Sequence, residues 1–203
     1  MSIHRVYVTT LMAASIAASP GVAKADSGML ADSIGVIDVH PQVQSPVLRA
    51  QVSSDAQPVV GLNYYLTSHV AVATQIAFPR HEISVGGVSQ GSVSLAPFNR
   101  LLQYHFMPAR KFSPYLGAGI NHTIFFDQSG LLPGFDHFGP STGAVLQSGF
   151  NYRPGRKYFV NIDVAKWYSK TDLTPQRSAT IETTKLNPVT VGVSLGRYPG
   201  STL

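Results

Sequence analysis

The stretch PYLGAGINHTIFF, residues 114–126, decides the fold. Apolar side chains at even-numbered positions, such as Leu116 and Phe126, alternate with small or polar ones at odd-numbered positions, such as Gly117 and Asn121. Successive residues of a β-strand point to opposite faces of a sheet, whereas a helix spaces its apolar residues three or four apart. The stretch therefore predicts a β-strand with one apolar face and one polar face.

The same alternation recurs from residue 57 to the C-terminus and predicts six further strands. A weaker alternation over Asp32–His40 predicts an eighth, and eight is the smallest even number of strands in an outer-membrane barrel. The connections alternate between short ones and long ones. The short ones are predicted at 67–68, 108–113 and 153–156, and the long ones at about 41–56, 80–97, 127–140 and 169–186. Short periplasmic turns and long extracellular loops are the expected layout of such a barrel.

Composition supports a membrane barrel. Hydrophobic residues make up 44% of the 203 residues, and charged residues only 12%, which is about half the share of a soluble domain. The chain has no cysteine, which excludes a disulfide framework, a thiol nucleophile and a thiolate metal site. The formal charge is +5 without a run of Lys or Arg, so nucleic-acid binding is not expected. The seven histidines show no ligand spacing, and we expect neither a metal nor a cofactor.

The N-terminus has the pattern of a secretory signal peptide. A positive start up to Arg5 precedes an apolar segment over residues 6–18, and Ala23 and Ala25 form an A-x-A cleavage signal. The apolar part is shorter than the roughly 20 residues of a membrane-spanning helix. We predict a leader over residues 1–25, cleavage between Ala25 and Asp26, and a barrel domain over 26–203. Loss of two basic residues then leaves a charge of +5 − 2 = +3.

These observations predict an all-β fold, an eight-stranded antiparallel transmembrane β-barrel in the bacterial outer membrane. In a membrane barrel the apolar side chains face lipid and the polar or small ones face the lumen. A soluble lipocalin-like barrel would invert the two faces. The leader, the low charge and the aromatic residues near strand ends favour the membrane. Those aromatic residues would form interfacial girdles: Tyr64, Phe78, Tyr104, Phe106, Phe126, Phe150, Tyr152, Tyr158 and Tyr168.

Two segments resemble the OmpW family of outer-membrane proteins. Residues 114–126 resemble its P-Y-x-G-A-G-x-N-Y-T…F-F stretch, and Leu101–Phe106 resembles its L-x-L-Q-Y-Y-F strand. The resemblance covers most of residues 57–198. The chain departs from the family in two places: its first strand is hard to recognise between residues 26 and 49, and its C-terminus does not end on an aromatic residue. Tyr198 is the candidate terminal-strand aromatic, and we therefore expect its recognition by the assembly machinery to differ from that of the family.

The resemblance implies a monomeric barrel with a narrow, rather hydrophobic lumen. It also implies passage of small hydrophobic molecules across the outer membrane, with exit sideways through the wall. Its implied partners are membrane lipids and lipopolysaccharide, a small hydrophobic ligand and the outer-membrane assembly machinery. Because eight strands leave an interior that side chains largely fill, a wide aqueous pore is not expected.

Odd-numbered and even-numbered positions of a strand face opposite sides of the wall, and we call this its parity. Parity provides the candidate ligand-binding residues of the lumen. Asp163 is an acidic residue in mid-strand, and at membrane depth it should face the interior and find a partner, for which His105 and Lys166 are the candidates. Apolar rings mixed with amides suit a weakly polar ligand, although the same side chains would also simply fill a small barrel. The candidates are Tyr65, Leu101, His105, Asn121, Phe125, Phe159, Asp163 and Trp167.

Two other functions stay open. Some small outer-membrane barrels modify lipid A, and such chemistry needs an activated nucleophile. Ser141, Ser148, His122 and His137 are present, but no nucleophile elbow joins them, so an enzyme is not expected. The other function is a passive structural or adhesive barrel, whose Gly- and Pro-rich loops bind partners.

Overall fold

The computed structural model describes residues 27–40, 43–44, 50–52, 55–78, 80–85, 88–129, 135–138, 140–175 and 182–199. The predicted leader over residues 1–25 and the cleavage site between Ala25 and Asp26 lie outside these residues and stay predictions. Within the described ranges, no helix is long and apolar enough to span a membrane.

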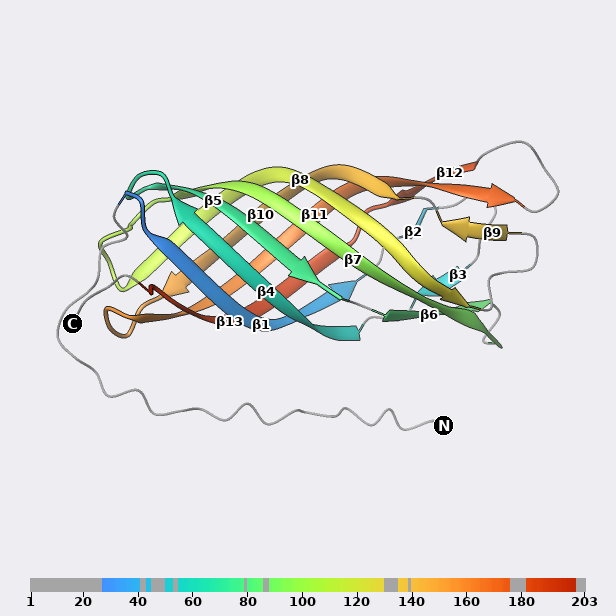
Figure 1. Ribbon diagram of the computed structural model, residues 1–203, viewed down its shortest axis with the longest axis horizontal. Coiled ribbons are helices and arrows are strands. Elements are labelled where there is room, and N and C mark those ends of the chain that lie inside the picture. Colours follow the sequence, from blue (N-terminus) through green and yellow to red (C-terminus); the bar gives the residue numbers. More distant parts are fainter. Residues whose placement is uncertain are drawn as a thin grey trace.

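Eight long antiparallel strands form one closed ring (Figure 1). Each strand pairs with its neighbours along the chain, and β13 returns to pair with β1. Closure leaves none of the eight with an unpaired edge. The predicted eight-stranded antiparallel barrel is thereby confirmed. Its strands are β1 (Leu30–His40), β4 (Asp55–Tyr65), β5 (Val70–Ala77), β7 (Val88–His105), β8 (Phe112–Ser129), β10 (Ser141–Tyr152), β11 (Tyr158–Pro175) and β13 (Val189–Arg197).

The weakly patterned first strand is present as β1, which begins two residues before the predicted start. It pairs along its length with β4 and β13, with Ile34 opposite Val60 and Val36 opposite Val193. The seam between the first and last strands carries an ion pair, in which Arg197 Nε donates to both carboxylate oxygens of Asp32 at 3.0 and 3.1 Å. Asp32 and Arg197 are also direct partners in the strand register.

The barrel has two different ends. We call the end with the three short connections the turn end; there β4 joins β5, β7 joins β8, and β10 joins β11. At the opposite end, the rim, the wall extends into further short strands (Figure 1). In an outer-membrane barrel the short turns are periplasmic and the rim is extracellular. The rim strands are β2 (Val43–Gln44), β3 (Ala50–Val52), β6 (Arg80–Val85), β9 (Phe135–Phe138) and β12 (Glu182–Leu186).

The rim corrects the prediction of four long loops, because much of that sequence forms strands. β6 and the first part of β7 pair as a hairpin, with Arg80 opposite Ser94 and Val85 opposite Val88. β11 continues to Pro175 and pairs with β9 and β12. Gly-Gly between β-branched residues also predicts a hairpin turn, and this explains why residues 80–97 form paired strands rather than the predicted loop.

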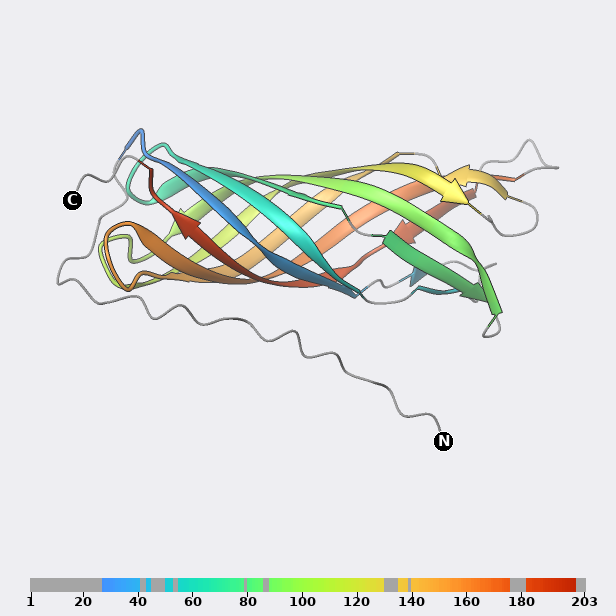
Figure 2. The ribbon, with the colours of Figure 1, turned by 60° about the horizontal axis from the view of Figure 1, so that its bottom comes forward.

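The two faces of the wall follow the predicted parity. Large apolar side chains on the outer face are well exposed, for example Ile34 at 65% and Leu102 at 56%. Inward side chains such as Asn121 and Val145 have no exposed surface. The strands run obliquely around the barrel axis (Figure 2), as barrel closure requires. The apolar face is therefore the outer one, and of the predicted girdle rings only Phe150 is half-buried rather than exposed.

Candidate functional site: the barrel lumen

A cluster of rings fills the turn end of the lumen, and we call it the plug. Neighbouring ring centroids lie 5.3 Å apart for Tyr65 and His105, 5.0 Å for His105 and Tyr115, and 5.1 Å for Phe159 and Tyr198. These are normal spacings for packed rings, and every ring is at most 3% exposed. The plug therefore closes the turn end with tightly packed side chains. It consists of Tyr65, His105, Tyr115, Phe159 and Tyr198, with the guanidinium of Arg153 beside them.

Arg153 anchors the neighbouring turn to the barrel. It follows directly on β10 and is only 1% exposed. Its Nη2 donates hydrogen bonds to the carbonyl oxygens of Pro108 and, at 2.8 Å, of Arg110. Its backbone N–H donates to the carbonyl oxygen of Lys111 at 2.7 Å. A buried cation thus finds its acceptors in the turn between β7 and β8, which it holds at the end of the barrel.

The Phe159 ring occupies space that a glycine leaves empty. Gly196 is the register partner of Phe159 across β11 and β13. A Cβ atom at position 196 would lie 2.1 Å from Phe159 Cζ, closer than any real contact. Position 196 must therefore lack a side chain if Phe159 is to join the plug.

A network of amides and one carboxylate crosses the lumen next to the plug, and we call it the polar layer. Gln103 Nε2 donates to Gln147 Oε1 at 2.8 Å, and Gln147 Nε2 donates to Asp163 Oδ2 at 2.9 Å. Asn161 Nδ2 donates to Tyr115 Oη at 2.9 Å, which connects the layer to the plug. Because its members satisfy one another, the layer is costly to disrupt. It consists of Gln75, Gln103, Gln147, Asn151, Asn161 and Asp163.

Asp163 faces the lumen and is 6% exposed, as its parity predicted. The expected partner was wrong: the carboxylate accepts its hydrogen bond from Gln147, not from His105 or Lys166. Lys166 Nζ instead donates to the carbonyl oxygen of Asn187 at 2.7 Å. Lys166 follows the outward parity of β11, because it is an odd number of residues from Asp163, and this explains why the two do not meet.

The rim half of the described lumen is largely apolar, and we call it the rim chamber. On β7, Leu101 lies closer to the rim than Gln103 does, and on β10, Val145 lies closer to the rim than Gln147 does. The chamber thus follows directly on the polar layer. Its polar part is a chain in which Thr123 Oγ1 donates to Asn121 and Asn121 Nδ2 donates to Asn99, at 2.9 and 2.8 Å. Its apolar members are Ile37, Val39, Val59, Ala73, Ala77, Leu101, Val145, Ala165 and Trp167.

Side chains fill most of this interior. One cavity of about 10 Å³ lies in the polar layer, and a second of about 10 Å³ lies in the rim chamber beside Trp167. Each has room for roughly one water molecule. The filled interior agrees with the expectation for eight strands.

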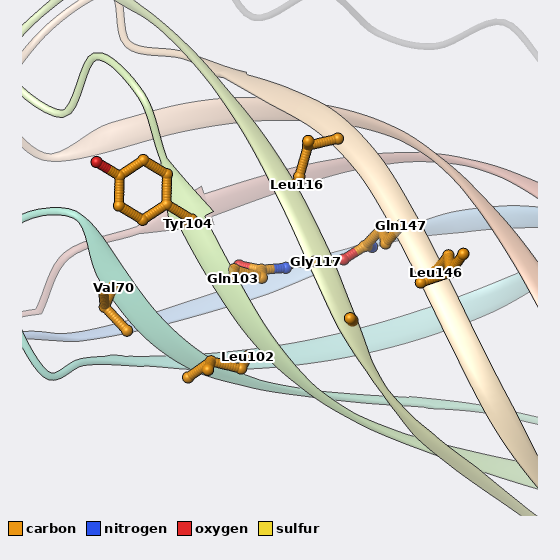
Figure 3. A pocket seen from close by; sticks show the side chains of 9 residues that line it. Val70, Leu102, Gln103, Tyr104, Leu116, Gly117, Leu146 and Gln147 are labelled. Atoms are coloured by element: carbon orange, nitrogen blue, oxygen red, sulfur yellow. Dashed lines mark hydrogen bonds between the residues drawn. The ribbon is translucent and has the colours of Figure 1, made fainter.

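The outer wall carries a groove on its lipid face, of about 450 Å³ (Figure 3). Leu102, Leu116 and Leu146 border it, and its floor is Gly117 and Ala118. Between Leu116 and Ile120, β8 carries only Gly117, Ala118 and Gly119. Figure 3 shows Gln103 and Gln147 on either side of Gly117, where their hydrogen bond closes the wall from the lumen side.

The eight residues predicted from parity fall in different parts of the lumen. Tyr65, His105 and Phe159 belong to the plug, and Asp163 to the polar layer. Leu101, Asn121 and Trp167 lie in the rim half, and Phe125 is half-buried on β8. Their role in ligand binding stays a prediction.

Three further residues of the lumen were not among the predicted ones, although parity indicates them. Tyr115, Arg153 and Tyr198 continue the inward alternation of β8, β10 and β13, but the last two follow directly after strand ends and were assigned to other roles. Tyr198 points into the plug, where it packs against Phe159.

The suggested enzyme residues do not come together. Ser141 is buried on the lumen side, whereas the adjacent His122 and Ser148 are exposed on the outer face. His122 Nδ1 instead shares a hydrogen bond with Thr142 Oγ1 at 2.9 Å. The His137 side chain lies outside the described residues.

A closed antiparallel barrel with an apolar outer face and a polar and aromatic interior defines an integral outer-membrane β-barrel protein. The sequence profile of the OmpW family matches residues 23–198, and the chain belongs to this family.

Named relatives agree with this assignment. The chain is 36% identical over 121 residues to the uncharacterized outer-membrane protein y4mB of Sinorhizobium fredii, covering 57% of this chain and about half (52%) of that protein. It is 32% identical over 159 residues to outer membrane protein W of Vibrio cholerae, covering 69% of this chain and 72% of that protein. The crystal structure of OprG from Pseudomonas aeruginosa shares the fold, with a TM-score of 0.71 and 22% identity over 87% of this chain and 97% of OprG.

Proposed function

We propose that this barrel mediates the passage of small hydrophobic molecules across the outer membrane, with the rim chamber as their binding place. The observation that carries the proposal is the order of the lumen: an apolar chamber on the rim side, then the polar layer, then the plug. An apolar molecule gains about 25 cal/mol for each Å² of its surface that leaves water. It therefore binds more favourably among the apolar side chains of the chamber, once these move apart to admit it, than in the medium outside.

The same order makes a path along the axis costly. Beyond the chamber, an apolar molecule would have to separate Gln103, Gln147 and Asp163 and offer no hydrogen bond in return. Each buried polar group left unpaired costs about 1–3 kcal/mol. We therefore propose that the molecule leaves sideways into the membrane from the chamber, before it reaches the polar layer.

The name of one further relative agrees with an apolar cargo. The "dibenzothiophene metabolism operon protein PahQ" of Pseudomonas aeruginosa is 32% identical over 116 residues, covering 55% of this chain and 54% of that protein. Dibenzothiophene is a fused, uncharged aromatic molecule. We propose uncharged apolar compounds as the cargo class of this chain as well.

The test is uptake of a labelled apolar compound, such as naphthalene, by cells that carry or lack the protein. Val145→Asn places an amide in the rim chamber, and Ala144→Asn places the same amide on the outer face as a matched control. A polar group facing an apolar ligand costs about 1 kcal/mol or more, so uptake through Val145→Asn should fall about fivefold. The control should keep its uptake, with both variants confirmed as folded by a heat-modifiable gel shift. Equal uptake with and without the protein would contradict the proposal.

A further inference from the structure

Two buried hydrogen-bond donors in the rim chamber have no partner among the described residues. They are the indole N–H of Trp167 and the hydroxyl of Thr190, whose side chains are 5% and 0% exposed. Buried donors are nearly always paired, because an unpaired one has lost its water without replacement. Two such donors close together can both donate to one acceptor that belongs to another molecule.

One donor, Trp167, lines a small cavity, and the other, Thr190, is the register partner of a residue that lines it. Trp167 lines it together with Val39, which is the register partner of Thr190 across the β1–β13 seam. On its other side Thr190 pairs with Ala165, two residues before Trp167 on β11. Trp167 and Thr190 are thus diagonal cross-strand neighbours on the lumen face, and side chains in this relation are within reach of a common partner.

The size and the lining of the cavity limit which kind of acceptor fits. Its volume of about 10 Å³ has room for one oxygen-sized end group. Ile37, Val59, Ala77 and Pro97 form the apolar part of its wall, and Gln75 and Asn99 form the polar part. The side-chain oxygens of Gln75 and Asn99 already accept hydrogen bonds from Gln147 and Asn121, so a water molecule would find few acceptors for its own protons. A carbonyl oxygen has two lone pairs, accepts from two donors and has no proton of its own to place.

We infer that the rim chamber recognises an apolar molecule that ends in a carbonyl oxygen, as in a ketone, an aldehyde or an ester. The oxygen accepts hydrogen bonds from Trp167 Nε1 and Thr190 Oγ1, and the hydrocarbon part lies toward the rim. This inference rests on the proposed function and narrows its cargo from apolar compounds in general to those with one acceptor.

The experiment compares n-nonane with 2-nonanone, which differ in one carbonyl group. The full-length mature barrel is placed in lipid nanodiscs, and headspace gas chromatography measures how much of each compound it retains beyond empty nanodiscs. Trp167→Phe keeps an aromatic ring but removes the N–H, and Thr190→Val removes the hydroxyl from a side chain of similar shape. Tyr168→Phe, on the exposed face of the same strand, is the matched control.

We expect Trp167→Phe to weaken retention of 2-nonanone about 2- to 10-fold, the value of one neutral hydrogen bond, and to leave n-nonane nearly unchanged. Thr190→Val should act in the same direction, and Tyr168→Phe should change neither compound. Equal weakening of both compounds, or no effect of either lumen variant on 2-nonanone, would overturn the carbonyl site while leaving hydrophobic binding intact. Retention of neither compound by the wild-type barrel would overturn the proposed function together with the inference.

Discussion

Replacement of Arg153 by Met should destabilise the barrel far more than the same replacement at Arg156. The Arg153 guanidinium is buried and donates to the carbonyl oxygens of Pro108 and Arg110, whereas Arg156 is exposed in the same turn. A hydrogen bond from a charged group contributes about 1.5–3 kcal/mol, so two such bonds amount to about 3–6 kcal/mol. The freed carbonyls lie in a turn and regain water, so we expect the lower end, a loss of about 3 kcal/mol.

The measurement is the free energy of unfolding in urea, on barrels refolded into detergent micelles, with band shift on unheated gels as a second readout. Arg156→Met should stay within about 0.5 kcal/mol of the wild type. Arg153→Lys keeps the charge but not the planar fork of donors, and should recover only part of the loss. If Arg153→Met costs less than about 1 kcal/mol, the plug does not depend on this anchor and our account of the turn end is wrong.

Three further outcomes are expected. Gly196→Val should cost about 1–3 kcal/mol of unfolding free energy by displacing the plug ring beneath it, whereas Gly155→Ala, with nothing within 4 Å of the new Cβ, should cost almost nothing. Asp163→Leu should lower the free energy of unfolding by about 1–3 kcal/mol, because it leaves Gln147 short of an acceptor. Asp163→Asn retains an oxygen at that place and should lower it less. An equal loss in the two variants would assign the effect to the charge of Asp163. Mass spectrometry of the outer-membrane protein should show a mature chain that begins at Asp26, and a chain retaining residues 1–25 would disprove the leader.

Alternation was enough to predict the barrel because the two faces of its wall meet two different environments, lipid and a polar interior. β1 was weakly predicted because charged side chains interrupt its outward face. Asp32 pairs with Arg197, and Asp38 carboxylate oxygen Oδ2 lies 3.1 Å from His40 Nε2. The partner of Asp32 is 165 residues away in the sequence, so no local pattern reveals why an acidic residue is tolerated there.

Parity also predicts which side chains enter the lumen, but not which of them meet. Contacts across the interior depend on the stagger between strands, which the sequence does not display. The predicted partners of Asp163 were therefore wrong. Its actual partner, Gln147, lies diagonally across from it on β10, opposite Ala165 in the register. Arg153 was missed for a different reason: it follows a strand end and has the sequence of a turn residue, while its side chain continues the inward alternation of β10.

The central claim is that the rim chamber holds a small apolar molecule, and Trp167 offers a direct test as the single tryptophan of the chain. Bromine quenches indole fluorescence at short range, so 1-bromooctane can be titrated into barrels in lipid nanodiscs. Lipids brominated on their acyl chains serve as the comparison from outside the wall. We predict saturable quenching by 1-bromooctane and little quenching by the lipids, because the indole is buried on the lumen side. Quenching that never saturates, or that is equally strong from brominated lipid, would contradict the claim.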